Sequence, residues 1–237
     1  MAHLAEHSLT TIAFDADDTL WHNERFFQLT QTHFAHLLAD YTDRETLMAR
    51  LLEAERRNLG RYGFGIKGFV LSMIETAIDV TEQRVPASVI AQLLQAGQDM
   101  LVHPIELLPH AKETVKALAG RYKLLMITKG DLLDQERKLA QSGLGELFDH
   151  VEIVSAKTPD VYTSIFNTHA DGPSKAMMVG NSMRSDVVPA VDIGAWGVFV
   201  PHGIEWEIEK ADPPLGATRY RTIEDLGALP DLIAGIC

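Results

Sequence analysis

The chain has 237 residues, 46% of them hydrophobic, which is enough for one large domain or for a domain with a smaller insert. Its 33 acidic and 21 basic residues give a formal net charge of -12, which disfavours nucleic-acid polymers and anionic membranes as partners. The one cysteine, Cys237, excludes an internal disulfide and a cysteine metal cluster. Without a signal pattern or an apolar run of membrane-spanning length, we expect a cytoplasmic protein.

Two kinds of pattern divide the chain. Short β-rich segments alternate with helical patterns at Thr10–Leu20 and Val102–Ile236, whereas residues 22–100 look helical throughout. We predict an α/β fold with a Rossmann-like, mainly parallel sheet in a core of residues 1–20 and 103–237, and a small all-helical domain inserted at 21–102. The expected strands are 11–14, 123–128, 151–154, 176–179 and 197–200, and the expected core helices lie near 110–120, 132–142, 159–169 and 184–193.

The insert has the pattern of four amphipathic helices. The first carries an apolar stripe over residues 26–38, and the second begins at the capping-box pair Thr42 and Glu45 and ends near Arg57. The third and fourth are expected at 69–80 and 86–100.

Residues 58–68 contain four glycines, so we expect a loop there. The loop is either a plain connection between helices or a segment that lowers a cation and an aromatic ring over a bound substrate. In the second case, Arg61 or Lys67 contacts an anionic or hydroxyl-rich leaving group.

Polar side chains follow four of the expected strands, at the end where ligands gather on a parallel sheet. An acid nucleophile, a hydroxyl, a lysine and a further acid suit a phosphoryl group beside a hard cation such as Mg²⁺. Lys175 competes with Lys157 for the lysine role, but it precedes a strand. In chain order the polar groups are Asp15 and Asp17, then Thr128, Lys129 and Gly130, then Lys157, then Asn181 and Asp186.

These motifs resemble those of the haloacid dehalogenase (HAD) superfamily, on its phosphatase branch. Asp15-Ala-Asp17-Asp18-Thr19-Leu20 is similar to the first motif, Thr128 to the second, Lys157 to the third, and Gly180-Asn181-Ser182 with Asp186 to the fourth. The match spans nearly the whole chain. It implies a HAD-like fold with a helical cap domain, and a Mg²⁺-dependent phosphatase that hydrolyses a small phosphorylated metabolite.

The resemblance also implies residue roles. Asp15 becomes an aspartyl phosphate, and Asp17 is the general acid and base. The Mg²⁺ ligands are Asp15, the backbone carbonyl of Asp17 and Asp186, with Asn181 as an uncharged oxygen ligand where an acid is more usual. The groups expected beside the substrate are Thr19, Gly130 and, at the rim, Lys129, in addition to Arg61 and Lys67.

Several alternatives stay open. A phosphomutase or phosphotransferase would pass the phosphoryl group to an alcohol, and a degenerate member would bind a phosphorylated ligand without turnover. A dehalogenase is disfavoured because, by family pattern, dehalogenases lack the second acid that Asp17 supplies. The ten histidines are scattered without paired metal-ligand spacing, so we assign them no chemistry. The expected partner is a small phosphomonoester, and the oligomeric state is left open because an apolar cap face and a dimer surface look alike in sequence.

Overall fold

The computed structural model describes residues 9–236, so Cys237 and the first eight residues of the expected core lie outside the described residues. The chain forms two compact units. The first comprises Met1–His22, Ile105–Lys129 and Gln135–Cys237, and the second comprises Asn23–Pro104 and Gly130–Asp134. No helix in the described part of the chain is both long and apolar enough to span a bilayer.

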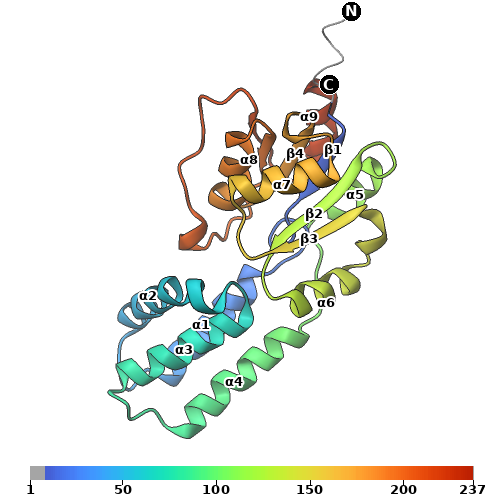
Figure 1. Ribbon diagram of the computed structural model, residues 1–237. Helices are drawn as coiled ribbons and strands as arrows, with labels where there is room; N and C mark the ends of the chain where they lie inside the picture. Colours follow the sequence, from blue (N-terminus) through green and yellow to red (C-terminus); the bar gives the residue numbers. More distant parts are fainter. Residues whose placement is uncertain (1–8, 237) are drawn as a thin grey trace, which may run out of the picture. The chain divides into compact units, whose positions relative to one another are not determined.

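A six-stranded sheet forms the centre of the first unit, and all its pairs are parallel, in the order β3-β2-β1-β4-β5-β6 (Figure 1). The predicted mainly parallel α/β fold is therefore confirmed. The short strand β6 was not predicted, because three residues are too few to show an alternating pattern. The strands are β1 (Thr11–Phe14), β2 (Lys123–Lys129), β3 (His150–Val154), β4 (Ala176–Gly180), β5 (Trp196–Phe199) and β6 (Tyr220–Thr222).

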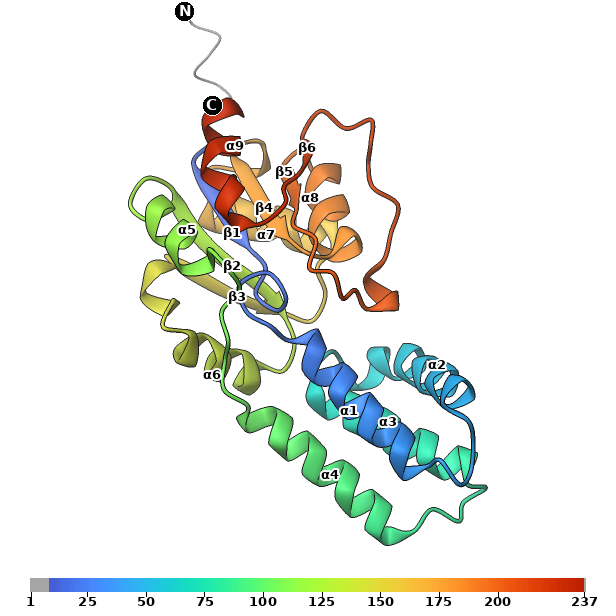
Figure 2. The ribbon, with the colours of Figure 1, turned by 180° about the vertical axis from the view of Figure 1, so that it is seen from behind.

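Helices cover both faces of this sheet, which explains why its central strands are apolar at successive positions. Ile12 and Phe14 of β1 pack in one cluster with α5 (Ala111–Leu118) and α9 (Leu229–Ile236), the helices seen in front in Figure 2. Ala13 points to the opposite face, in a cluster with α7 (Pro159–His169) and α8 (Val188–Asp192). Because helices pack on both faces, the strands are held in place, and the polar side chains at their ends are held with them. The helix α6 (Leu132–Ser142) follows β2 and packs Leu139 against the first cluster.

The second unit is helical, and its four helices share one apolar core. They are α1 (Glu24–Leu37), α2 (Arg44–Tyr62), α3 (Ile66–Val80) and α4 (Ala87–Val102). The cap of α2 differs from the predicted pair: Asp43, rather than Thr42, is the N-cap and accepts a hydrogen bond from the Thr46 backbone at 2.9 Å. The same contacts lower the pKa of the Asp43 carboxyl.

The expected loop at residues 58–68 is wrong for most of its length. The helix α2 continues to Tyr62, and only Gly63–Gly65 separate it from α3. Asn58 explains the continuation, because its side chain donates to Ser72 (3.2 Å) and Glu75 (2.7 Å) on α3 and so holds the two helices together. Glycine at 60 and 68 therefore lies within helices.

Gly130–Asp134 was expected in the core, but it clusters with the helical unit. The reason is an ion pair of 2.8 Å between Asp131 and Lys67, together with the approach of Gly65 to the Asp131 backbone. Lys67 is consequently engaged within its own unit.

Two glycines of the helical unit provide a matched stability prediction. At Gly68 an added Cβ would meet the Gly63 carbonyl oxygen at 2.9 Å, whereas at the exposed Gly60 it would meet nothing within 4 Å. We expect Gly68→Ala to destabilise the protein by about 1–3 kcal/mol, as overpacking does. Gly60→Ala should stabilise it by up to roughly 1 kcal/mol through helix propensity. Urea unfolding followed by circular dichroism measures both, and equal effects would contradict the packing found here.

Candidate active site

The site lies at the carboxyl ends of neighbouring strands in the first unit. Phe14 of β1 is level with Met126 of β2 and Val179 of β4, so the residues that follow these strands emerge together. Asp15 is fixed at the end of β1 by its backbone N–H, which donates to the Val179 carbonyl at 2.9 Å. Thr128, buried near the end of β2, is brought to the same edge.

Asp186 reaches this edge from the turn after β4. Gly180 makes room for it, since a Cβ at that position would collide with the Asp186 carboxylate. Ser182 orients it: its backbone N–H donates to Asp186 Oδ2 at 2.9 Å, and its side chain caps the π-helical turn Met183–Val187. The acid is 1% exposed and thus almost fully removed from water.

Lys157 joins the two acids. Its Nζ donates to Asp15 Oδ1 and, at 2.6 Å, to Asp186 Oδ1, and its side chain is 1% exposed. Thr158, the next residue after Lys157, is the N-cap of α7, and Pro159 follows it in the first turn of that helix. Lys157, the lysine expected from the third motif, therefore contacts the expected nucleophile, Asp15. Lys175 lies in a short helical turn before β4.

Burial and the Asp186 carboxylate raise the pKa of Asp15 from 3.8 to about 7, even though Lys157 acts in the opposite direction. Burial alone would lower the pKa of Lys157, but the two carboxylates outweigh it and raise that pKa above its usual range. Two buried carboxylates thus share a single ammonium group. Their surplus negative charge is what a divalent cation would balance.

This donor set fits Mg²⁺. Asp15 and Asp186 offer carboxylate oxygens, the Asp17 backbone offers a carbonyl, and a hard cation binds such oxygen atoms together with water and substrate. Asn181 does not fit the expected ligand role. We assign its amide nitrogen toward Asp15 Oδ2 (3.2 Å) and the Asp17 carbonyl (3.1 Å), because the atom there faces only acceptors. Asn181 is thus a hydrogen-bond donor to Asp15.

Thr19 lies against the same carboxylate, that of Asp15. Its hydroxyl donates to Asp15 Oδ2 at 3.0 Å and accepts from the Asn181 backbone at 3.1 Å. Its position therefore supports the carboxylate directly, while a contact with substrate stays a prediction.

Asp17 is held by three donors that the sequence analysis did not assign to the site. Trp21 Nε1 donates to Asp17 Oδ1 at 2.7 Å, Gln135 donates to Oδ2 at 2.8 Å, and Lys138 lies 3.0 and 3.1 Å from the two oxygens. Gln135 also donates to the Thr128 hydroxyl at 3.1 Å. Gln135 and Lys138 face inward from α6. In the sequence, such buried polar residues look the same as polar residues on the solvent-exposed face of a helix. The available signal was that the two residues are three positions apart, and so on one face of the helix that follows the second motif.

Lys129 is engaged within the protein, although it was expected at the rim beside the substrate. Its Nζ lies 2.6 Å from Glu209 and 2.7 Å from the Ser185 hydroxyl. Burial would raise the pKa of Glu209, but Lys129 and the neighbouring serines outweigh burial and lower it. Gly130 adopts a φ of 140°, a backbone conformation that favours glycine, and belongs to the helical unit.

Arg61 and Lys67 lie in the helical unit, Arg61 in the last turn of α2 and Lys67 in the first turn of α3. Arg61 is exposed, whereas Lys67 pairs with Asp131. Their contact with substrate stays a prediction.

Comparisons with known proteins identify the family. A family model described as a haloacid dehalogenase-like hydrolase matches residues 9–194, whereas no curated protein matches the chain.

Among solved structures, a haloacid dehalogenase-like family hydrolase from Xanthomonas campestris is 38% identical, with a TM-score of 0.86, over 100% of this chain and 95% of that one. The HAD-hydrolase YfnB from Bacillus subtilis, bound to magnesium, is 16% identical, with a TM-score of 0.66 over 95% and 99% of the two chains. L-2-haloacid dehalogenase from Xanthobacter autotrophicus is 20% identical, with a TM-score of 0.66 over 97% and 100%. With its family-model match over most of its length and its similarity to the Xanthomonas protein, the chain belongs to the haloacid dehalogenase-like hydrolases.

Proposed function

We propose that the protein is a Mg²⁺-dependent phosphatase that hydrolyses a small phosphomonoester through an aspartyl phosphate on Asp15. The observation that carries the proposal is the buried lysine, Lys157, in contact with both Asp15 and Asp186 at the carboxyl edge of the sheet. The second acid, Asp17, supports phosphate chemistry because an alkoxide leaving group needs a proton that a halide does not. The coarser activity, that of a hydrolase, follows from the family.

In the first step a carboxylate oxygen of Asp15 attacks phosphorus, and the bond between phosphorus and the leaving oxygen breaks. Asp17 gives a proton to that oxygen, so that the alcohol departs neutral. Thr128 donates its hydroxyl to a phosphate oxygen, and Lys157 neutralises charge on the nucleophile and on the transferring group.

In the second step Asp17, now a carboxylate, takes a proton from water, and the water oxygen forms a bond to phosphorus. The bond between phosphorus and Asp15 breaks, which releases inorganic phosphate and restores the Asp15 carboxylate. When bound, Mg²⁺ would supply positive charge against the phosphate oxygens, held by Asp15, Asp186 and the Asp17 carbonyl.

The first prediction concerns the nucleophile. Asp15→Asn should lose phosphate release almost completely while remaining folded, because Lys157 keeps Asp186 as a partner. Phosphate is measured for a panel of phosphorylated metabolites and an aryl phosphate. Asp192→Asn, which changes an exposed acid on α8, is the control and should keep its rate. Wild-type rates in Asp15→Asn would discard the nucleophile assignment, and release of halide from 2-haloacids, with none of phosphate, would redirect the proposal to dehalogenation.

Metal removal gives a second prediction. Chelation should abolish turnover, and Mg²⁺ at about 100 times its dissociation constant should stabilise the folded protein by about 2.7 kcal/mol. The melting temperature should therefore rise by several degrees. In Asp186→Asn the rise should shrink or vanish, because one of the buried carboxylate ligands is gone. Turnover that is unaffected by chelator would remove Mg²⁺ from the proposal.

The third prediction separates the two roles of Asp17. With an aryl phosphate whose phenolate leaves without a proton, Asp17→Asn should still transfer the phosphoryl group to Asp15. Hydrolysis of the aspartyl phosphate should slow by about 10²–10⁴-fold, the usual contribution of a general base. Rapid mixing should then show a burst approaching one phenol per chain, followed by slow turnover. A steady-state rate equal to wild type, with no burst, would show that Asp17 is not the base.

A further inference from the structure

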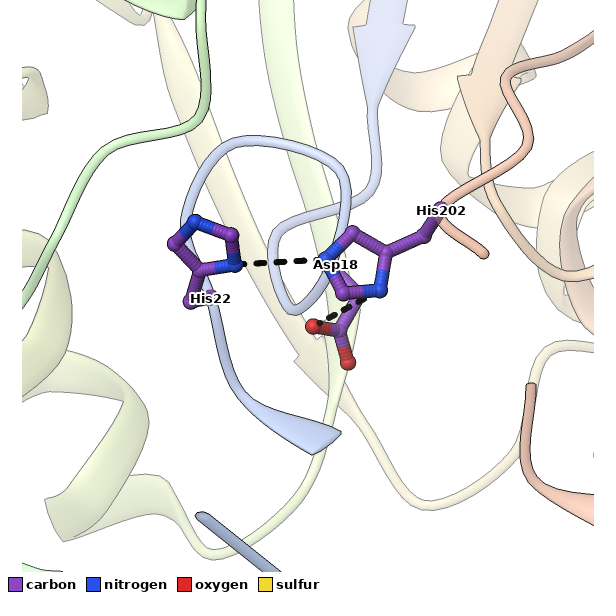
Figure 3. Close-up of side chains that lie close together, drawn as sticks. All are labelled: Asp18, His22 and His202. Carbon is purple, nitrogen blue, oxygen red and sulfur yellow. Dashed lines mark hydrogen bonds and ion pairs between the residues drawn. The ribbon is translucent and has the colours of Figure 1, made fainter. Parts of the chain in front are cut away.

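Two histidines and an acid that are distant in sequence converge in the first unit, beside but separate from the Asp15 and Asp186 pair. Asp18 and His22 belong to the turn after β1, and His202 follows β5 (Figure 3). The turn is fixed by backbone hydrogen bonds: Asp18 donates to the Trp21 carbonyl at 2.7 Å, and His22 donates to the Glu106 carbonyl at 3.0 Å. The cluster is therefore built on anchored backbone.

Electron-pair donors face one another in this cluster. His202 Nε2 lies 3.3 Å from His22 Nδ1, and His202 Nδ1 lies 3.3 Å from Asp18 Oδ1. One ligand atom from each of the three side chains can be chosen so that all lie within 4.8 Å of one another. The His202 and Asp18 side chains are only 7% and 6% exposed, so water screens them little.

Hydrogen bonding does not satisfy His202. Its Nδ1 is buried and has no hydrogen-bond partner among the described residues, because the contact with Asp18 meets the distance but not the geometry of a hydrogen bond. A buried ring nitrogen without a partner is costly.

We propose that Asp18, His22 and His202 bind a divalent transition metal of the Zn²⁺ class. Tetrahedral zinc, at about 2.0–2.2 Å from nitrogen and oxygen ligands, holds two such atoms about 3.3 Å apart, which is the separation of the unsatisfied His202 Nδ1 from Asp18 Oδ1 here. Two neutral imidazoles and one carboxylate suit Zn²⁺, whereas Mg²⁺ prefers an all-oxygen site. Water would fill the fourth position. The metal would link the segment after β5 to the turn that carries the first motif.

The site is tested in the full-length protein carrying Asp186→Asn, a change that removes a carboxylate of the other proposed cation site. The protein is first stripped of metal with a chelator and is then kept in excess Mg²⁺. Equilibrium dialysis should find one Zn²⁺ per chain, and Co²⁺ should give the visible absorption of a tetrahedral site with nitrogen ligands. His22→Gln and His202→Gln should each weaken binding by more than the roughly 10–100-fold that changes outside the ligand set cause. The readout is binding, so it does not depend on the proposed phosphatase activity.

His169→Gln is the matched control, since His169 also pairs with an acid, Glu152 at 2.9 Å, and stacks on His150. It should leave the one equivalent intact. The inference is overturned if the Asp186→Asn protein takes up no Zn²⁺, or if His169→Gln loses the metal and the two ligand variants keep it. His22 is only partly buried. If His202→Gln fails to fold, His22→Gln therefore decides alone, and retention of full affinity in that variant also refutes the site.

Discussion

The contact of Lys157 with two buried carboxylates is the interaction on which the site depends. Asp15 and Asp186 both contact this lysine beyond the ends of adjacent strands, and burial beside a second carboxylate raises the pKa of Asp15. The surrounding structure serves this contact: Gly180 leaves space for Asp186, and Thr158 caps the helix that follows Lys157. One lysine faces two carboxylates, so the pair would favour a further positive charge such as that of the proposed Mg²⁺.

The positions of five strands along the chain, and the polar residues near their ends, could be read from the sequence because the signal is local. A buried strand of a parallel sheet is a short apolar run, and the residue at which it turns polar marks the sheet edge. Asp15, Thr128 and Asp186 each follow such a run. Lys157 was harder, since its own strand, β3, is mostly half exposed, and it was assigned from its place after that strand and from the resemblance to the third motif.

What the sequence could not show depends on contacts between distant segments. The glycines near residue 60 suggested a loop, but the bonds from Asn58 to α3 outweigh the modest cost of glycine in a helix. The amide of Asn181 turns its nitrogen to the carboxylate because of three acceptors that only the folded chain assembles. His22 and His202 are likewise 180 positions apart, so no spacing rule could pair them.

The proposed chemistry requires Asp17 to act first as an acid and then as a base, and its hydrogen bonds bear on both roles. Trp21, Gln135 and Lys138 all donate to its carboxyl oxygens. To protonate a leaving alcohol, Asp17 must first carry a proton. One of the three side chains must then give up its hydrogen bond to the protonated oxygen of Asp17. Gln135 is suited to do so, because the two hydrogens of its amide face three acceptors: Asp17, the Thr128 hydroxyl and the Lys129 carbonyl. Gln135 thus joins Asp17, the proposed acid and base, to Thr128, the proposed phosphate-binding hydroxyl, through one side chain.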